Sequence, residues 1–224
     1  MASDRYFDRR ALAFLKDLRE NNRREWFKEN KARYEASVRD PCLRFITDLA
    51  PALRKLSPHL LADPRPVGGS LFRIHRDTRF SRDKSPYKTH AGAYFSARKR
   101  GEETQAPGFY LHLEPGGCFA AAGLWRPEPE TLALVRAALV AKPADWRKVR
   151  ARIDVEGESL ARAPRGFDPE HPLIDDIKRK DFVTTRPFTE AQVTGPRFLA
   201  EYVAACRSMS PLVAFLSRAV GARW

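Results

Sequence analysis

The sequence predicts an α+β protein in which N-terminal helices pack on one face of a mainly antiparallel sheet of about four strands or more, with C-terminal helices following. Apolar residues recur at helical spacing in residues 1–60, alternate with polar residues over 71–125, and return to helical spacing after residue 129. Helices grouped at the two ends of an antiparallel sheet are typical of the α+β class. No long linker divides the chain, so we expect one domain, 1–224.

Helices are expected both before and after the predicted sheet in the chain. Asp8 is a suitable N-cap for the first helix, and the pair Asn21-Asn22 ends it. A second helix starts near Arg23, and Asp40-Pro41, a cap followed by proline, indicates that a third begins there and runs to about Leu56. After the sheet we expect helices over Pro129–Val140, around Trp146, over Leu173–Lys180, over Pro196–Ser208 and over Pro211–Val220.

Alternation of apolar and polar residues predicts the strands. The segments are Leu71–Arg76, Thr89–Ser96, Phe109–Glu114 and Cys118–Trp125, with a further strand over Asp181–Arg186. The pair Gly116-Gly117 is a hairpin signal between two of them. One face of the sheet is then apolar and packs on the helices. The other face carries Arg73, His75, His90, Tyr94, Tyr110, His112 and Glu114.

Composition excludes several classes of protein. Hydrophobic residues make up 43% and charged residues 31% of the 224 residues, which is typical of a folded soluble chain. No apolar run approaches the ~18 residues of a membrane helix, and residues 1–10 lack a secretory apolar region, so we expect a cytoplasmic protein without a membrane partner. The cysteines Cys42, Cys118 and Cys206 are far apart, and no metal site is predicted.

The net charge of +13 suits a partner that carries phosphates. Arginine supplies 30 of the 41 cations, however, and a GC-rich coding sequence produces such a bias by itself. The distribution of charge is more informative. Between Arg73 and Arg100 nine cations stand against two anions, so that 28 residues carry +7 of the total. Within this stretch, Arg73 to His90 is the segment that we expect to bind an anion.

The segment from Arg73 to His90 combines arginines with residues that favour burial. A guanidinium presents a planar set of donors that matches the oxygens of a phosphate. Phe72, Ile74, Phe80, Pro86 and Tyr87 are the expected anchors. The predicted ligand-binding residues are Arg73, Arg76, Arg79, Lys84, Tyr87 and Lys88, with Tyr87 or Tyr94 able to stack on a base or sugar. Arg165, in the proline-rich loop 161–172, could close over them as a lid.

Asp77, His75 and His90 are the candidates for proton transfer. A carboxylate beside several arginines has a lowered pKa and is a poor base at neutral pH, so Asp77 and Asp83 are better explained as groups that orient the arginines. His75, His90 and His112 share the polar face of the predicted sheet, where they could bind a metal or relay protons, although their spacing matches no known ligand pattern. Neither a cofactor nor a reaction type is indicated, and the sequence leaves open whether the protein is an enzyme.

Three functions fit these residues. The first is binding of a small phosphorylated ligand, such as a nucleotide, with an enzymatic activity of undetermined type. The second is a nucleic-acid-binding module, favoured by the charge and by an aromatic content of 11%. In the third, the arginines and aspartates form a structural ion-pair network and bind no ligand. The sequence lacks the standard signatures of P-loop proteins, dinucleotide oxidoreductases, α/β-hydrolases and zinc proteases.

Four stretches give a resemblance that covers nearly the whole chain. They are FLKDLRENNRREWF from Phe14, FRIHRDTRFSRDKSPYKTH from Phe72, APGFYLHLEP from Ala106 and PRGFD from Pro164. With these motifs the chain resembles a family of conserved hypothetical proteins, domain-of-unknown-function family 2461. The resemblance implies that the chain is one unit. It implies no activity, cofactor or catalytic residue.

Overall fold

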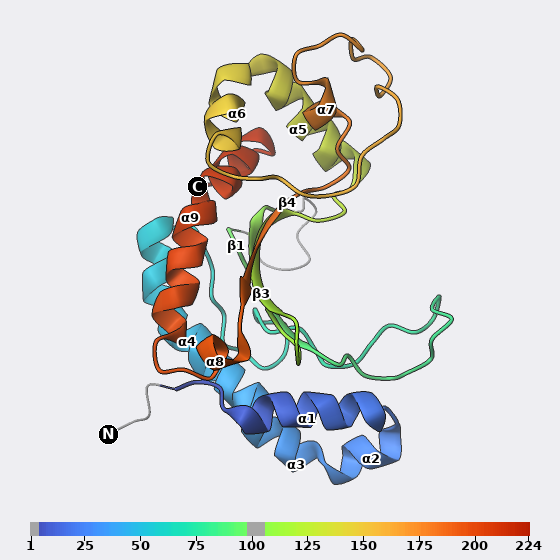
Figure 1. Ribbon diagram of the computed structural model, residues 1–224, viewed down its shortest axis with the longest axis vertical. Helices are drawn as coiled ribbons and strands as arrows, with labels where there is room; N and C mark the ends of the chain where they lie inside the picture. Colours follow the sequence, from blue (N-terminus) through green and yellow to red (C-terminus); the bar gives the residue numbers. More distant parts are fainter. Residues whose placement is uncertain (1–4, 98–105) are drawn as a thin grey trace.

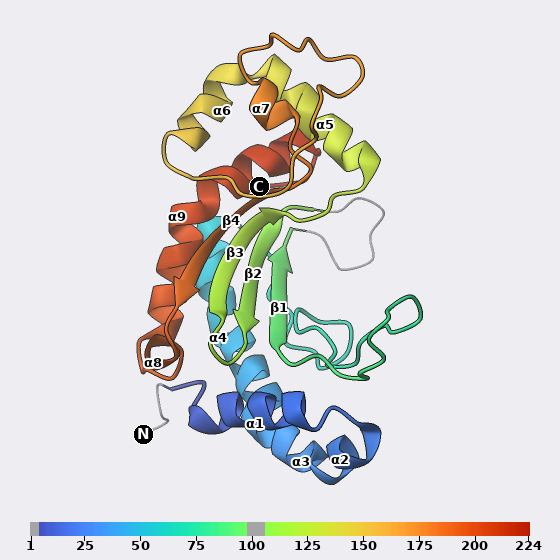
Figure 2. The same ribbon diagram turned by 45° about the vertical axis from the view of Figure 1, so that its right-hand side comes forward.

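The fold is built around one antiparallel sheet. The computed structural model describes residues 5–97 and 106–224. The strands run in the order β1 (Ala91–Ser96), β2 (Gly108–Leu113), β3 (Cys118–Leu124) and β4 (Phe182–Phe188), each antiparallel to its neighbours. Helices precede and follow the sheet (Figure 1, Figure 2), so the predicted α+β class is confirmed. Arg98, Lys99 and Arg100, which belong to the basic stretch, lie outside the described residues.

The N-terminal region is helical. It contains α1 (Arg9–Glu20), α2 (Arg24–Glu29), α3 (Lys31–Tyr34), the π-helix η1 (Glu35–Arg39) and α4 (Asp40–Leu56). The carboxylate of Asp8 caps α1 and Asn21 ends it, as predicted. The predicted third helix, from Asp40 to about Leu56, is confirmed as α4, but Asp40 does not cap it, because the chain passes from η1 into α4 without leaving helical geometry. The N–H of Asp40 bonds to the carbonyl of Glu35, and this wider turn accommodates Pro41, which has no N–H.

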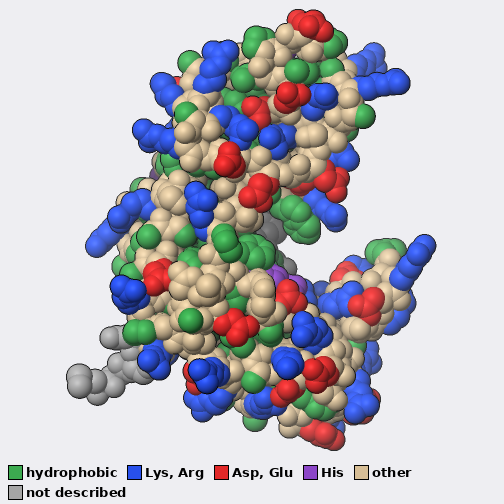
Figure 3. Space-filling view, viewed as in Figure 1, with side chains coloured by type: hydrophobic (Ala, Val, Ile, Leu, Met, Phe, Trp, Pro, Cys, Tyr) green, Lys and Arg blue, Asp and Glu red, His purple; other side chains and the backbone are tan. Residues whose placement is uncertain are grey.

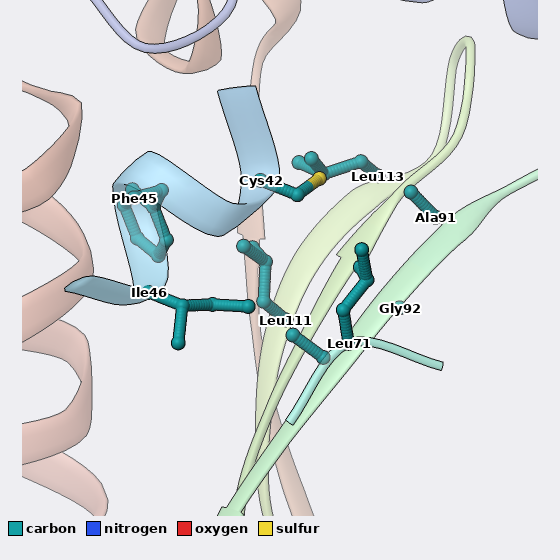
Figure 4. Close-up of a pocket in the computed structure, with 9 residues that line it drawn as sticks. Cys42, Phe45, Ile46, Leu71, Ala91, Gly92, Leu111 and Leu113 are labelled. Atoms are coloured by element: carbon teal, nitrogen blue, oxygen red, sulfur yellow. The ribbon is translucent and has the colours of Figure 1, made fainter. Parts of the chain in front are cut away.

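The two faces of the sheet differ as the alternation predicts. Helices α4 and α9 (Phe198–Ala219) cover one face (Figure 1). There Cys42 and Ile46 of α4 meet Leu111 and Leu113 of β2 in a contact that leaves no room for a water molecule (Figure 4). Such packing removes apolar surface from water and fixes the sheet against the helices. The opposite face carries the polar side chains of β2.

The segment before β1 leaves the sheet and forms an arm. The predicted strand Leu71–Arg76 is wrong, since only isolated bridges join Leu71 to Ala93 and His75 to Tyr87. The chain instead folds back on itself, and the N–H of Arg76 donates to the carbonyl of Pro86 at 2.9 Å. Proline has no N–H to donate in return, so the two segments do not form a regular ladder of β-sheet hydrogen bonds. Residues 73–88, here called the arm, extend away from the sheet in both ribbon views (Figure 1, Figure 2).

Helices of the second half of the chain form an upper lobe with its own core. The lobe contains α5 (Pro129–Ala141), α6 (Pro143–Arg150), α7 (Ile174–Ile177) and the loop 151–173. Its core includes the fully buried side chains of Trp146, Phe182 and Leu216. The predicted helices over Pro129–Val140 and around Trp146 are confirmed, and so is the further strand, which is β4. The short helix α8 (Glu190–Val193) then leads into α9.

Helix α9 runs through both cores. Two helices were expected, with the second beginning at Pro211, but the structure contains one continuous helix with Pro211 inside it. The fully buried side chains of Met209 and Leu212 flank the proline, so packing on both sides holds the helix together where one hydrogen bond is missing. The length of α9 and its mean hydropathy of 1.2 would also fit a membrane-crossing helix. However, half of the apolar stretch that meets this criterion is buried inside the protein.

Candidate functional site

The polar face of β2 carries a chain of hydrogen bonds. The hydroxyl of Tyr110 lies 3.0 Å from Nδ1 of His112, and Nε2 of His112 lies 3.2 Å from a carboxylate oxygen of Glu114. The hydroxyl of Thr89 donates to the other oxygen of this carboxylate at 3.2 Å. A carboxylate only accepts, so Nε2–H is the donor and Nδ1 accepts from the tyrosine. We call Tyr110, His112 and Glu114 the relay.

Gly92 makes the relay possible. It lies opposite His112 in the register of β1 and β2. A Cβ at this position would lie 2.9 Å from Cε2 of Tyr110 and closer still to its hydroxyl. The missing side chain therefore leaves the space in which the Tyr110 hydroxyl approaches the imidazole. Phe119 of β3 stacks on His112 from the other side, with ring centroids 4.6 Å apart and planes at 15°.

His90 lies beside the relay. Its ring centroid is 4.4 Å from that of His112. Burial, together with the neighbouring His112, lowers the pKa of His90 to about 4, so its imidazole is neutral at pH 7 and one of its ring nitrogens is an acceptor. Burial also raises the pKa of Tyr110 to about 12, which keeps the hydroxyl protonated and able to donate. A neutral base and a hydroxyl donor therefore lie on one surface.

Lys88 joins the base of the arm to this surface. Its ammonium donates to the carbonyl of Arg73 at 3.0 Å and lies 5.4 Å from the centre of the Phe72 ring. Phe72 in turn lies 6.1 Å from the ring of Tyr110. The positive charge of Lys88 also contributes to the lowered pKa of His90. Of the predicted ligand-binding cations, Lys88 therefore has the clearest link to the relay.

The outer cations of the arm are held by partners within the arm. Arg76 pairs with Asp83, Arg79 pairs with Asp77 at 2.7 Å, and Lys84 donates to the carbonyl of Thr78 at 2.9 Å. Hydrogen bonds from Arg79 lower the pKa of Asp77 to about 2, and hydrogen bonds from Ser85 and Arg76 lower that of Asp83. Both aspartates orient neighbouring groups, and neither has the pKa of a general base at neutral pH.

Two of the predicted site residues serve as contacts between the arm and the helices. Tyr87 is buried and stacks on Phe27 of α2, with centroids 4.1 Å apart, so its ring is occupied by the protein itself. His75 was expected beside His90 and His112. It lies instead on the arm, with its ring 5.2 Å from Tyr87, because its segment leaves the sheet edge. Tyr94, the other expected stacking residue, donates its hydroxyl to the carbonyl of Ala106 at 2.7 Å.

The molecular surface is hollowed between the arm and the upper lobe. Figure 3 shows this notch, with histidine side chains at its inner end and cations along the arm. The loop 151–173, which includes Arg165, lies at the far end of the upper lobe in both ribbon views (Figure 1, Figure 2). The arm and histidine side chains therefore lie at one notch, and the loop that contains Arg165 does not lie over them. Within residues 5–97 and 106–224, no group of three His, Cys, Asp or Glu side chains could hold a metal ion.

Fold and site define an α+β protein whose sheet presents a Tyr–His–Glu hydrogen-bond chain beside a basic arm. The chain belongs to the family of conserved hypothetical proteins DUF2461, whose model matches residues 10–215. This match confirms the resemblance seen in the sequence motifs. No curated protein and no solved structure matches the chain.

The sequence alone could predict only part of this site. The spacing correctly indicated that Tyr110 and His112 share one face of a strand, and Glu114 follows directly after its end. The approach of His90 to His112 depends on the strand register, and the role of Gly92 depends on a neighbouring ring. A signal was present, since glycine inside a strand often marks close approach of another group.

Proposed function

We propose that the protein binds a small phosphate-bearing ligand, such as a nucleotide, in the notch between the arm and the upper lobe. The observation that supports this most strongly is the placement of Lys88 beside His90 and the relay. A cation next to neutral donors and acceptors suits an anion that must also be oriented. Within the arm, Asp83 pairs with Arg76 and Asp77 pairs with Arg79.

Each group of the notch has a part in this proposal. Lys88 and Arg73 at the base of the arm provide positive charge for the phosphate. The hydroxyl of Tyr110, protonated at pH 7, donates to a ligand oxygen or to the relay. Arg76 and Arg79, already oriented by their aspartates, supply further donors from the arm.

The same surface contains groups for proton transfer. His90 is neutral at pH 7 because its pKa is lowered to about 4, and it can accept a proton from a ligand hydroxyl or a water. The Glu114 carboxylate holds His112 in the tautomer that accepts from Tyr110. Enzymatic use of the site would therefore run through His90, while Asp77, at a pKa of about 2, stays ionised.

A thermal-shift screen with nucleotides and phosphosugars tests this function. One site filled at about 100 times its dissociation constant adds about 2.7 kcal/mol to the free energy of unfolding. Lys88→Ala should abolish the shift given by an active compound. Lys148→Ala is the matched control, because this lysine is exposed on α6 in the upper lobe. Absence of a shift with every phosphorylated compound contradicts the proposal.

A further inference from the structure

A second hollow in the protein surface, here called the groove, lies between α1 and α8. It has a volume of about 990 Å³ and is open to solvent. One wall is formed by α1, and the other by Pro115 of the hairpin between β2 and β3 and by residues of the segment 190–196. Both ribbon views place α8 near the start of α1 (Figure 1, Figure 2). None of the described residues that line the groove belongs to the arm or the relay, so the groove is distinct from the notch.

The α1 wall of the groove combines cations with a small apolar surface. Arg9, Ala13 and Lys16 follow one another at helical spacing, so they share one face of α1. The buried side chain of Leu12 also lines the groove. Because alanine has a short side chain, Ala13 leaves room between the two cations. At a rise of 1.5 Å per residue, Arg9 and Lys16 are separated by about 10 Å along the helix axis.

The charge of Arg9 and Lys16 is not neutralised within the part of the chain that the structure describes. Both side chains are exposed, and neither pairs with a described carboxylate. The acidic side chains of the groove are engaged by other groups. Asp8 accepts from the N–H of Arg10 at 2.8 Å and pairs with its guanidinium at 2.6 Å. A carboxylate oxygen of Glu190 accepts from a backbone N–H of the hairpin between β2 and β3 at 2.9 Å. The α1 wall therefore carries positive charge that suits an acidic partner.

The opposite wall of the groove is fixed by its own hydrogen bonds. Thr189 and Gln192 form a capping box at the start of α8. After α8, the hydroxyl of Thr194 donates to the carbonyl of Glu190 at 2.9 Å, and the N–H of Gly195 donates to the carbonyl of Gln192 at 3.1 Å. A wall formed in advance lowers the entropy cost of binding a partner. Its apolar lining residues are Pro115, Ala191 and Pro196.

We propose that the groove binds an extended acidic peptide segment of a partner protein, with two carboxylates three positions apart and apolar residues between them. Residues three apart in an extended chain are separated by about 10 Å, which matches the spacing of Arg9 and Lys16 along α1. The carboxylates pair with these two cations, and the intervening side chains contact the apolar lining. This interaction goes beyond the phosphate-bearing ligand of the notch and does not depend on it.

The lining of the groove favours a peptide over a nucleic-acid strand. Single strands are bound by stacking their bases on aromatic side chains beside cations, and no described residue of the lining is aromatic. Asp8 and Glu190 would also repel a continuous row of phosphates. A peptide, in contrast, has its carboxylates at separate positions and can place apolar or polar residues beside these two acids.

Fluorescence anisotropy at about 50 mM salt tests the proposal, because low salt preserves the attraction between exposed charges. The probe is a labelled peptide with two glutamates three positions apart and leucine and alanine between them. The same peptide with glutamines in their place should not bind. Arg9→Gln and Lys16→Gln should each weaken binding of the glutamate peptide about threefold. Ala13→Glu, which places a negative charge between the two cations, should weaken it about tenfold or more. Arg19→Gln is the matched control, since Arg19 is exposed on α1 outside the groove.

An exchange of charges separates loss of binding from loss of folding. The double variant Arg9→Glu, Lys16→Glu should lose the glutamate peptide and bind a peptide with lysines at the same two positions. Glutamate at the first residue of α1 suits the start of a helix, so the variant should remain folded. Binding of the lysine peptide by this variant, and not by the wild type, supports the proposal.

Three results would overturn the proposal. One is that the wild type does not bind the glutamate peptide at about 50 mM salt, where exposed charges are least screened. Another is that the peptide binds but Arg9→Gln and Lys16→Gln leave its affinity unchanged. The third is that a labelled oligonucleotide binds more tightly than the peptide and is weakened by these same variants. Lys88→Ala should bind the peptide as the wild type does, which separates the groove from the notch.

Discussion

The side-chain amide of Asn22 pairs with both backbone polar groups of Tyr87. Its nitrogen donates to the Tyr87 carbonyl at 2.9 Å, and its oxygen accepts from the Tyr87 N–H at 3.0 Å. A neighbouring strand would satisfy Tyr87 in the same way. The turn between α1 and α2 thereby holds the base of the arm, and the stacking of Tyr87 on Phe27 adds an apolar contact. The arm is fixed at its base and extends away from the body beyond it (Figure 1).

We expect Asn22→Ala to loosen the arm. Loss of two half-buried hydrogen bonds should lower the free energy of unfolding by about 2 kcal/mol. Hydrogen exchange at the Tyr87 amide should become faster in the same variant. Asn21→Ala is the matched control, because among the described residues that side chain bonds to the carbonyl of Asp17 in its own helix end. Unchanged exchange at Tyr87 in Asn22→Ala would show that the pair does not anchor the arm.

Replacement of Gly92 should disturb the relay. In Gly92→Ala the new methyl group displaces the Tyr110 ring, because that ring already fills the space above Gly92. The hydrogen bond from Tyr110 to His112 should then break, and the Nδ1 resonance of His112 should move in a nitrogen NMR spectrum. Gly117→Ala is the control, since its Cβ would meet only a carboxylate oxygen of Glu114 at 3.9 Å. A His112 spectrum identical to that of the wild type in Gly92→Ala contradicts the described geometry.

His90 should make stability depend on pH. Its folded pKa of about 4 lies below the usual value of 6.5 for histidine, so between these two pH values the unfolded chain binds a proton that the folded chain does not bind. The contribution of His90 should therefore fall as pH drops from about 6.5 to about 4 and rise as pH increases. His112 and Lys88 disfavour the charged imidazole, whereas Glu114 favours it.

Denaturant unfolding of the wild type and of His90→Asn between pH 4 and pH 7 measures this contribution. Carboxylates elsewhere titrate in both proteins and cancel in the comparison. The wild type should lose more stability than the variant as pH falls. Parallel curves for the two proteins would mean that His90 is not held in a neutral state.

The ion pairs of the arm should affect local order more than global stability. Exposed pairs contribute little to the free energy of unfolding, because water and salt screen them. Arg76→Ala combined with Arg79→Ala should leave the melting temperature nearly unchanged and speed hydrogen exchange in the arm. Ligand affinity should fall in the same double variant. A large drop in melting temperature without any ligand effect would favour the structural ion-pair network instead.

Local signals predicted most of the fold. Asp8 marked the start of α1 because a carboxylate at that position satisfies an open N–H, and alternation located β1, β2 and β3 correctly. Pro211 misled, because packing on either side keeps a helix continuous across a proline. Pro41 marked the start of α4 correctly, but the wider turn of η1 joins α4 to the preceding helix. The first part of the arm was mistaken for a strand of the sheet. Its alternation arises from pairing with the second part of the arm, where the chain folds back.

The candidate site was predicted less completely, since contacts between distant segments cannot be read from spacing. His90 was named as a candidate, and its polar-face neighbours were identified. The burial that lowers its pKa depends on the register of β1 and β2. Phe80 was expected to anchor the arm, but it is 93% exposed. Its outward position is equally invisible in the sequence, because an aromatic residue among arginines suits either an anchor or an exposed surface.

The most direct test of phosphate binding in the notch uses the imidazole resonances of the five histidines. In a titration with inorganic phosphate at constant pH and ionic strength, the resonances of His90 and His112 should shift in a saturable manner. Those of His59 and His171, outside the arm and the relay, should stay in place and serve as internal controls. Lys88→Ala should reduce the shifts of His90 and His112. Resonances of His90 and His112 that do not move, or that move no more than those of His59 and His171, would contradict the proposed site.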